Sequence, residues 1–182
     1  MSITKIKNGL ICWCLWNDTQ SVHDNYAKYA SPPQPCRVDD LSYLPVIFSN
    51  VCSLILRLPT NTPIYLHSTD EQSILESIKN HASLYNEKKD TRYHLFDIEH
   101  FENSLGSWID QNRINRVLIA GLAHNQCLQQ CYYVLDKLQT YLSFEYYTVA
   151  GCTANICTEK KITIFKTVDK IDQKKFIDLE MI

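Results

Sequence analysis

Apolar residues recur along this chain in blocks whose spacing switches between that of strands and that of helices. Five short apolar runs are typical of buried strands, at residues 10–16, 64–67, 93–96, 117–120 and 144–150. The segments between them carry apolar residues at helical spacing, at residues 44–58, 69–85, 97–109 and 125–138. This alternation predicts an α/β fold: a three-layer α/β/α arrangement with a mostly parallel, Rossmann-like sheet.

Two local signals refine these boundaries. Asp97 is the predicted N-cap of the helix that contains Phe101 and Trp108, because a short carboxylate at that position accepts free backbone N–H groups. Gly121 is predicted to end the fourth strand, since glycine allows a sharp turn of the backbone. Gly151 is likewise placed at the end of the fifth strand.

The end of the chain departs from the alternation. The apolar pattern of residues 162–168 predicts a sixth strand. Only about ten residues separate it from the fifth strand, whereas a parallel crossover connection needs a dozen or more. The last strand is therefore either antiparallel or reached through a tight irregular loop. Residues 171–182 form a tail with no clear pattern, and residues 1–182 are predicted to be a single domain.

Composition excludes several classes of function. The net charge of −2 leaves no electrostatic footprint for nucleic acid or for an anionic membrane. No apolar run reaches the length of a membrane-spanning helix, and the short apolar N-terminal stretch is broken by Asn17 and Asp18, unlike a signal peptide. We therefore expect a cytoplasmic protein. Its eight cysteines are then expected to be free thiols, most of them in the core.

Cys127 has the most distinctive setting among these cysteines. A buried strand ends near Gly121, and helical spacing begins at about Asn125, so Cys127 falls in the first turn of a helix at the carboxyl end of a strand. Free N–H groups and the helix dipole stabilise an anion there, which would include a thiolate. The same N–H groups could bind the oxyanion that forms when a carbonyl is attacked.

The order of several segments resembles the isochorismatase-like hydrolases. The similarity is strongest from Phe101 to His124, where a helix that begins with Phe leads to a strand, a glycine and an Ala-His pair. Residues 61–69 (Asn-Thr-Pro-Ile-Tyr-Leu-His-Ser-Thr) are similar to the second strand of that family, and residues 18–20 (Asp-Thr-Gln) to the end of its first strand. Residues 144–151 are similar to its fifth strand, so the resemblance covers roughly residues 8–168.

The resemblance implies roles for particular residues. In amidase members of the family, Cys127 would match the nucleophile and Asp18 the base that takes its proton. The backbone N–H of Ala123 would join that of Cys127 as an oxyanion donor. His124, Gln20 and Asn125 are candidate substrate-binding residues. The family needs no cofactor for this chemistry, and a lone Gly121 is no phosphate-binding loop, so no nucleotide is expected.

The sequence also departs from the family pattern at several positions. Leu95 stands where the family has a catalytic Lys, and Gly151 stands where it has an Asp. The helix between the fifth and sixth strands is missing. A second alignment of Asn17-Asp18 would put Cys14 in the base position, and a thiol is no simple substitute for a carboxylate base.

Each candidate residue also has a plain structural interpretation. Cys127 could fill a small space at the start of a helix, Asp18 could be a solvated cap, and His124 could be a turn residue. Gln20 and Asn125 could be caps or surface residues. Cys14, His23 and His67 could gather at one sheet edge, but no spacing is typical of a zinc site, so no metal is expected.

Three hypotheses for function follow. The first is a cysteine hydrolase that acts on a small amide or related metabolite. The second is a catalytically silent member of the fold that binds a ligand or a protein partner. The third is an isochorismatase-type vinyl ether hydrolase that uses Asp18 without Cys127. A homo-oligomer is a further expectation, because one member of each adjacent tyrosine pair, at 132–133 and 146–147, must point outward.

Overall fold

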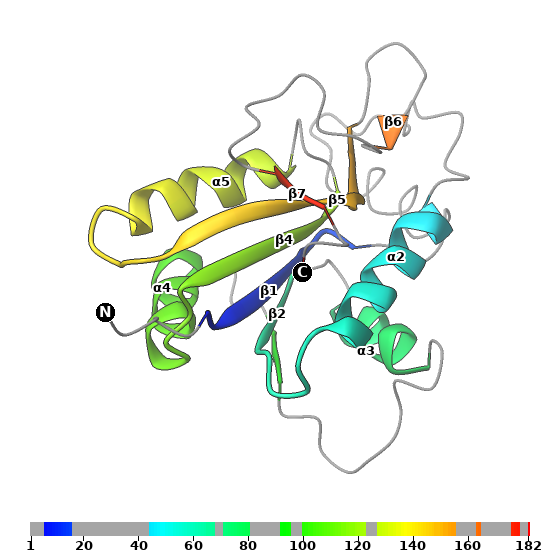
Figure 1. Cartoon of the computed structure of the whole chain (residues 1–182), viewed down its shortest axis with the longest axis horizontal. Helices are drawn as coiled ribbons and strands as arrows, with labels where there is room; N and C mark the ends of the chain where they lie inside the picture. Colours follow the sequence, from blue (N-terminus) through cyan, green and yellow to red (C-terminus); the bar gives the residue numbers. More distant parts are fainter. Residues whose placement is uncertain are drawn as a thin grey trace.

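The computed structural model describes residues 6–15, 44–67, 71–80, 92–95, 100–122, 127–155, 163–164, 176–178 and 182. Its strands are β1 (Asn8–Trp13), β2 (Ile64–His67), β3 (Tyr93–Leu95), β4 (Arg116–Leu122), β5 (Glu145–Asn155), β6 (Thr163–Ile164) and β7 (Phe176–Ile177). Its helices are α2 (Leu44–Arg57), α3 (Glu71–Asn80), α4 (Phe101–Gln111) and α5 (Cys127–Leu138). Figure 1 shows these helices arranged around a single twisted sheet.

The sheet has the strand order β3-β2-β1-β4-β5, and all four neighbouring pairs in this part are parallel. In register, Trp13 at the end of β1 lies beside His67 of β2 on one side and Gly121 of β4 on the other. The prediction of an α/β fold with a mostly parallel, Rossmann-like sheet is confirmed. No helix among the described residues is long and apolar enough to span a membrane.

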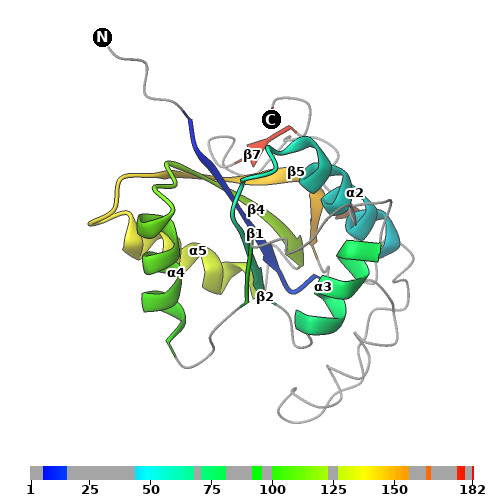
Figure 2. The ribbon, with the colours of Figure 1, turned by 90° about the horizontal axis from the view of Figure 1, so that it is seen from below.

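Strand alternation divides the buried side chains of the sheet between two hydrophobic cores. In β1, Leu10 and Cys12 pack into one core together with α2 and α3, which we call the α2–α3 core. Ile11 and Trp13 point to the other face and pack with α4 and α5, in the α4–α5 core. Strands covered on both faces need to be apolar throughout, which explains the unbroken apolar runs of the sequence. Figure 2 shows the two helix pairs on opposite sides of the sheet.

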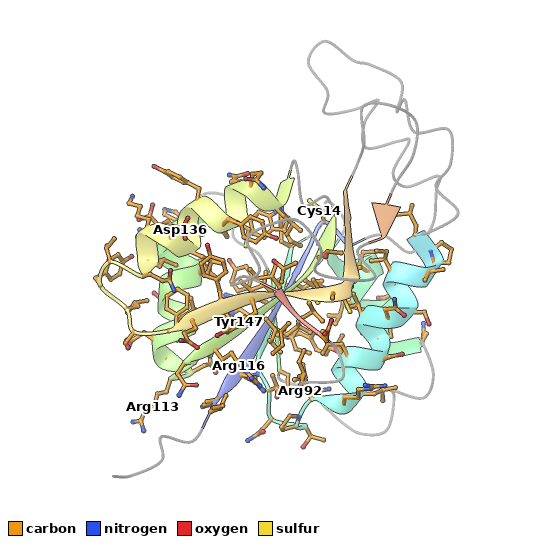
Figure 3. All side chains as sticks on the ribbon, turned by 45° about the horizontal axis from the view of Figure 1, so that its top comes forward. Cys14, Arg92, Arg113, Arg116, Asp136 and Tyr147 are labelled. Atoms are coloured by element: carbon orange, nitrogen blue, oxygen red, sulfur yellow. The ribbon has the colours of Figure 1, made fainter. Side chains whose placement is uncertain are left out.

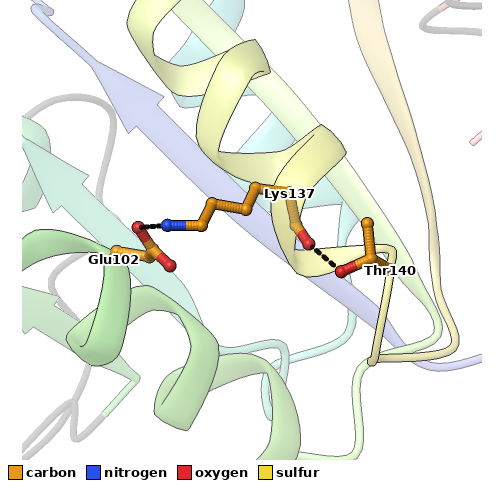
Figure 4. Close-up of polar contacts among 3 residues, drawn as sticks. All are labelled: Glu102, Lys137 and Thr140. Carbon is orange, nitrogen blue, oxygen red and sulfur yellow. Dashed lines mark hydrogen bonds and ion pairs between the residues drawn. The ribbon is translucent and has the colours of Figure 1, made fainter.

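A surface contact joins the two helices of the α4–α5 face. Lys137 Nζ of α5 donates to Glu102 Oε2 of α4 at 2.7 Å, and Thr140 Oγ1 donates to the carbonyl oxygen of Lys137 at 2.7 Å (Figure 4). The hydrogen bond to Glu102 raises the pKa of Lys137. Such an exposed ion pair adds little to stability, so the buried apolar residues hold these helices in place.

The two members of each adjacent tyrosine pair differ in burial, because neighbouring side chains of a helix or a strand point in different directions. Tyr132 is buried against the α4–α5 core and Tyr133 is 70% exposed. Tyr146 is buried and Tyr147 is half-buried. The prediction that one member of each pair points outward is confirmed for Tyr133, whereas Tyr147 packs against the α2–α3 core. Self-association stays a prediction.

Several predicted boundaries were wrong at the carboxyl ends of strands. β1 ends at Trp13 instead of continuing to residue 16, because Cys14 adopts a left-handed backbone conformation with φ of 47°. Gly121 does not end β4, which continues to Leu122. Gly151 does not end β5 but lies inside it, since the strand runs on to Asn155.

Other elements also differ from the expectations. α4 begins at Phe101 with His100 as its N-cap, so the prediction that Asp97 caps this helix was wrong. β6 pairs antiparallel with the end of β5, which confirms one of the two alternatives for the sixth strand. The tail contributes a short strand as well, since β7 pairs parallel with β5 at Thr148 and Val149.

Candidate functional site

The candidate site lies at the carboxyl edge of the sheet between β1 and β4. The chain leaves β1 toward α2 on one face, whereas it leaves β4 toward α5 on the other face. A reversal of this kind is called a topological switch point. It separates the two crossover connections and leaves a place for a ligand beyond the strand ends. Trp13 and Leu122 end the two strands at this point.

Gly121 brings the two backbones unusually close together here. Its φ is 120°, a conformation that L-residues with side chains rarely adopt. A Cβ at this position would overlap the carbonyl oxygen of Trp13 and would lie 2.8 Å from the carbonyl carbon of Trp13. Glycine is therefore required so that β4 can pass beside the end of β1.

Cys14 turns the chain immediately after β1. Its backbone N–H donates to the carbonyl oxygen of His67 at 2.7 Å. Strict alternation would send Cys14 to the α2–α3 core with Cys12, but the left-handed residue instead packs against the α4–α5 core, and Leu15 returns to the α2–α3 core. The left-handed conformation costs about 1–2 kcal/mol at a residue with a side chain. The thiol of Cys14 therefore lies on the same face of the sheet as α5.

His67 ends β2 beside these residues and contacts aromatic rings. Its ring centroid lies 4.2 Å from that of Trp13, and the Trp13 ring lies 4.9 Å from that of Phe101 at the start of α4. Burial lowers the pKa of His67 from its ordinary value near 6.5 to about 4. The imidazole is therefore neutral at neutral pH, so it offers hydrogen bonds without a positive charge.

Cys127 is the first residue of α5, which confirms the prediction that it lies in the first turn of a helix. The helix buries Leu128, Cys131 and Leu135 against the α4–α5 core, so its N-terminus is held at the carboxyl edge of the sheet. No acidic residue lies in its first turn. The structure describes Cys127 through its backbone only.

Other cysteines of the chain have surroundings that oppose ionisation. Cys12, Cys52, Cys131 and Cys152 are fully buried free thiols. Desolvation raises the pKa of Cys52 and of Cys152 to about 12, and it raises those of Cys12 and Cys131 further. These four thiols pack as small apolar residues, as the sequence predicted for most of the cysteines.

The remaining predicted site residues lie outside the residues that the structure describes. They are Asp18, Gln20, Ala123, His124 and Asn125. Their roles stay predictions.

The structure adds two residues to this neighbourhood, Cys14 and His67. The sequence had placed His67 at the carboxyl end of the second predicted strand, and it offered Cys14 and His67 as part of a possible zinc cluster and Cys14 as an alternative match for the base. Neither residue was a predicted catalytic or substrate-binding residue. Nothing in the local sequence indicates the left-handed turn at Cys14.

Leu95, which the resemblance matches to the family's lysine, is the last residue of β3. Leu95 is 41% exposed. Three basic residues lie at the opposite edge, because Lys7 and Arg92 directly precede β1 and β3, and Arg116 begins β4. In Figure 3, Cys14 and the labelled arginines lie toward opposite ends of the strands. A cation for the carboxyl edge is therefore not supplied by these three residues.

Comparisons of the chain with protein-family models, with curated proteins and with solved structures find no match. The resemblance to isochorismatase-like hydrolases therefore depends on the sequence segments quoted above. The assignment of the α/β architecture is independent of that resemblance, because it follows from the strand order of the sheet and from the two hydrophobic cores.

Proposed function

We propose that this protein is a cysteine hydrolase that acts on a small amide or a related metabolite without a cofactor. The observation that carries the proposal is the place of Cys127, which begins α5 directly beyond the switch point between β1 and β4. The first turn of a helix stabilises a thiolate through the dipole and free N–H groups. The carboxyl edge at a switch point is also where open α/β sheets bind small ligands.

The proposed reaction follows the roles that the family resemblance implies. Cys127 Sγ would attack the carbonyl carbon while Asp18 accepts the thiol proton. The backbone N–H groups of Ala123 and Cys127 would stabilise the oxyanion. Collapse of the tetrahedral intermediate would break the C–N bond, the amine would leave with the proton from Asp18, and water would then hydrolyse the thioester to the acid and the free thiol.

His67 would contribute as a neutral group at the edge of this site. Its low pKa means that it adds no charge near a thiolate at neutral pH, so it is better suited to orient a polar substrate than to act as a base. The proposed substrate is a small molecule, in keeping with the absence of a basic footprint for nucleic acid at a net charge of −2. The free thiols among the described cysteines suit the reducing cytoplasm, where we place the reaction.

A second candidate function is favoured by Leu95. An exposed leucine in place of the family's lysine removes a cation that would support the base and the oxyanion. A protein that kept the fold but lost this cation would bind a ligand or a partner without turning it over.

One experiment separates the two functions. Alkylation of Cys127 by iodoacetamide is followed across pH by peptide mass spectrometry, and ammonia release is measured on a panel of small primary amides. A hydrolase requires an apparent thiol pKa at Cys127 well below the ordinary value of ~8.5, together with activity that is lost in Cys127→Ala and Asp18→Asn.

The matched control is Cys131→Ala, which removes a buried thiol from the next turn of the same helix and should keep the activity. An ordinary pKa at Cys127 with no turnover would favour the ligand-binding protein. Loss of activity in Asp18→Asn but not in Cys127→Ala would instead favour ether cleavage.

A further inference from the structure

A large bulge interrupts β5 beside the candidate site. Thr148 pairs with Ile119 and Thr153 pairs with Gly121, so the four residues 149–152 of β5 lie opposite Ala120 alone. Gly151 within the bulge has a φ of 79°. Extra residues of this kind break the ladder and bend a strand, and in Figure 1 β5 changes direction near its end.

A side chain from a distant part of the chain holds this bulge. Asn50 Nδ2 of α2 donates to the carbonyl oxygen of Gly151 at 2.6 Å, across 101 residues of sequence. The bulge takes backbone groups out of the β4–β5 ladder, and half-buried carbonyl groups need another donor. Across the bulge, Thr153 Oγ1 also donates to the carbonyl oxygen of Val149 at 3.5 Å. Asn50 therefore connects the α2 helix to the one irregular stretch of this strand pair.

The bulge sets where the last residues of β5 lie. Beyond it, Thr153 is fully buried beside Gly121, and Ala154 pairs with Leu122, the last residue of β4. The residue after Leu122 is Ala123, whose N–H is the proposed oxyanion donor. The end of β5 is therefore in register with the strand end from which the proposed catalytic loop departs.

We propose that Asn50 is a positioning residue for this site: through Gly151 it fixes the end of β5, and through the β4–β5 pairing it fixes the departure of β4 toward Cys127. This inference rests on the proposed function, because it assigns Asn50 to the support of the oxyanion donors. Asn50 itself touches no substrate. Small displacements of such donors weaken transition-state binding more than substrate binding.

The test compares variants that differ in one hydrogen-bond donor. Asn50→Ala removes the donor, and Asn50→Asp keeps the size of the side chain while offering only acceptors at neutral pH. Asn50→Gln retains an amide donor and should restore part of the wild-type behaviour. Ser53→Ala is the matched control, because Ser53 Oγ donates to Ser49 O within α2 and makes no bond to β5.

Two measurements on the full chain decide the outcome. Hydrogen exchange at residues 151–155 should be about 10-fold faster in Asn50→Ala and Asn50→Asp than in the wild type and Ser53→Ala. On the small-amide substrate, kcat should fall about 10-fold or more with KM nearly unchanged. If Asn50→Ala does not fold, hydrogen exchange and the kinetic constants are both measured on Asn50→Asp instead.

The failure of this inference is distinct from the failure of the proposed function. Exchange and kcat within twofold of the wild type in both donor-free variants, in a protein that Cys127→Ala inactivates, would overturn the role of Asn50. If Cys127→Ala remains active, the hydrolase mechanism fails. Exchange at residues 116–122 and 151–155 then still decides whether Asn50 fixes the two strand ends.

Discussion

Gly121 and Trp13 are partners in the β1–β4 register, and the space that a side chain on Gly121 would need is filled by the backbone carbonyl of Trp13. Gly121→Ala should therefore combine backbone strain at φ 120° with a clash that no rotamer relieves. We expect a loss of about 3 kcal/mol or more in the free energy of unfolding, measured by urea denaturation.

Gly151 provides the matched comparison for this prediction. It also has a positive φ, but the nearest atom to a Cβ built there is Asn50 Nδ2 at an ordinary 3.7 Å. Gly151→Ala should cost only the conformational strain, about 1–2 kcal/mol. Equal losses in the free energy of unfolding of the two variants would show that the close approach of Trp13 does not add to the cost of a side chain at position 121.

The pH dependence of stability should contain a contribution from His67. Its pKa is near 6.5 in an unfolded chain and about 4 in the folded protein, so the unfolded state binds the proton first as pH falls. The stabilisation is complete above about pH 6.5 and decreases as the pH falls toward 4, by up to about 3 kcal/mol.

The variant His67→Gln isolates this contribution. Urea denaturation at several pH values should show a smaller loss of stability between about pH 7 and pH 4.5 in the variant than in the wild type. Measurements at about pH 8, where the imidazole is neutral in both states, set the baseline for each protein. Parallel curves for the two proteins would mean that His67 keeps an ordinary pKa in the fold.

A buried hydrogen bond between Tyr132 and Thr148 joins α5 to β5. The hydroxyl oxygens lie 2.8 Å apart, and both side chains are buried. Tyr132→Phe leaves the Thr148 hydroxyl without this partner and should lower the free energy of unfolding by about 1–2 kcal/mol. The double variant with Thr148→Val should lose less than the sum of the two single variants.

The neighbouring tyrosine is the control for this experiment. Tyr133 is 70% exposed, so Tyr133→Phe should change stability by less than about 0.5 kcal/mol. Strict additivity of Tyr132→Phe and Thr148→Val would argue against a direct bond between the two hydroxyls.

The buried thiols should resist alkylation in the native protein. Cys52 and Cys152 have a pKa of about 12 because burial disfavours the thiolate. At about pH 8 their thiolate fraction is then on the order of one in ten thousand. Iodoacetamide labelling, read by peptide mass spectrometry, should modify them only after unfolding in guanidinium. Native-state labelling at the rate of the unfolded chain would contradict their burial.

The central elements of the fold were predictable because their apolar spacing is set by burial on both sides of the sheet. The sequence places β2 at Ile64–His67, as the structure does, and the helix predicted to begin at Leu44 ends one residue before Leu58. Pro59 marks that boundary because it cannot continue a helix. These features depend on local pattern alone.

The irregular features at the strand ends were not predictable, because distant residues determine them. Gly151 resembles a strand terminator in the sequence, but β5 continues past it through a bulge in which the Gly151 carbonyl oxygen accepts a hydrogen bond from Asn50. Gly121 resembles a turn residue, but β4 continues because glycine makes room for Trp13. A glycine by itself does not reveal which tertiary contact uses its freedom.

The candidate site was predictable in part. The position of Cys127 follows from the change between strand and helix spacing, and the structure confirms that it begins α5. The left-handed turn at Cys14 has no signature in the sequence, and the burial of His67 depends on the Trp13 ring from a neighbouring strand. The role of Asp18 stays a prediction, since it lies outside the described residues.

The tail strand β7 has a consequence for solubility. β7 pairs with β5 at Thr148 and Val149, where the bulge begins, and β6 pairs with Ala154 and Asn155 beyond the bulge. An uncovered flank of this kind would present unpaired amides to the same flank of another molecule and would seed fibrous aggregates. The pairing of β7 therefore removes part of this edge from such contacts.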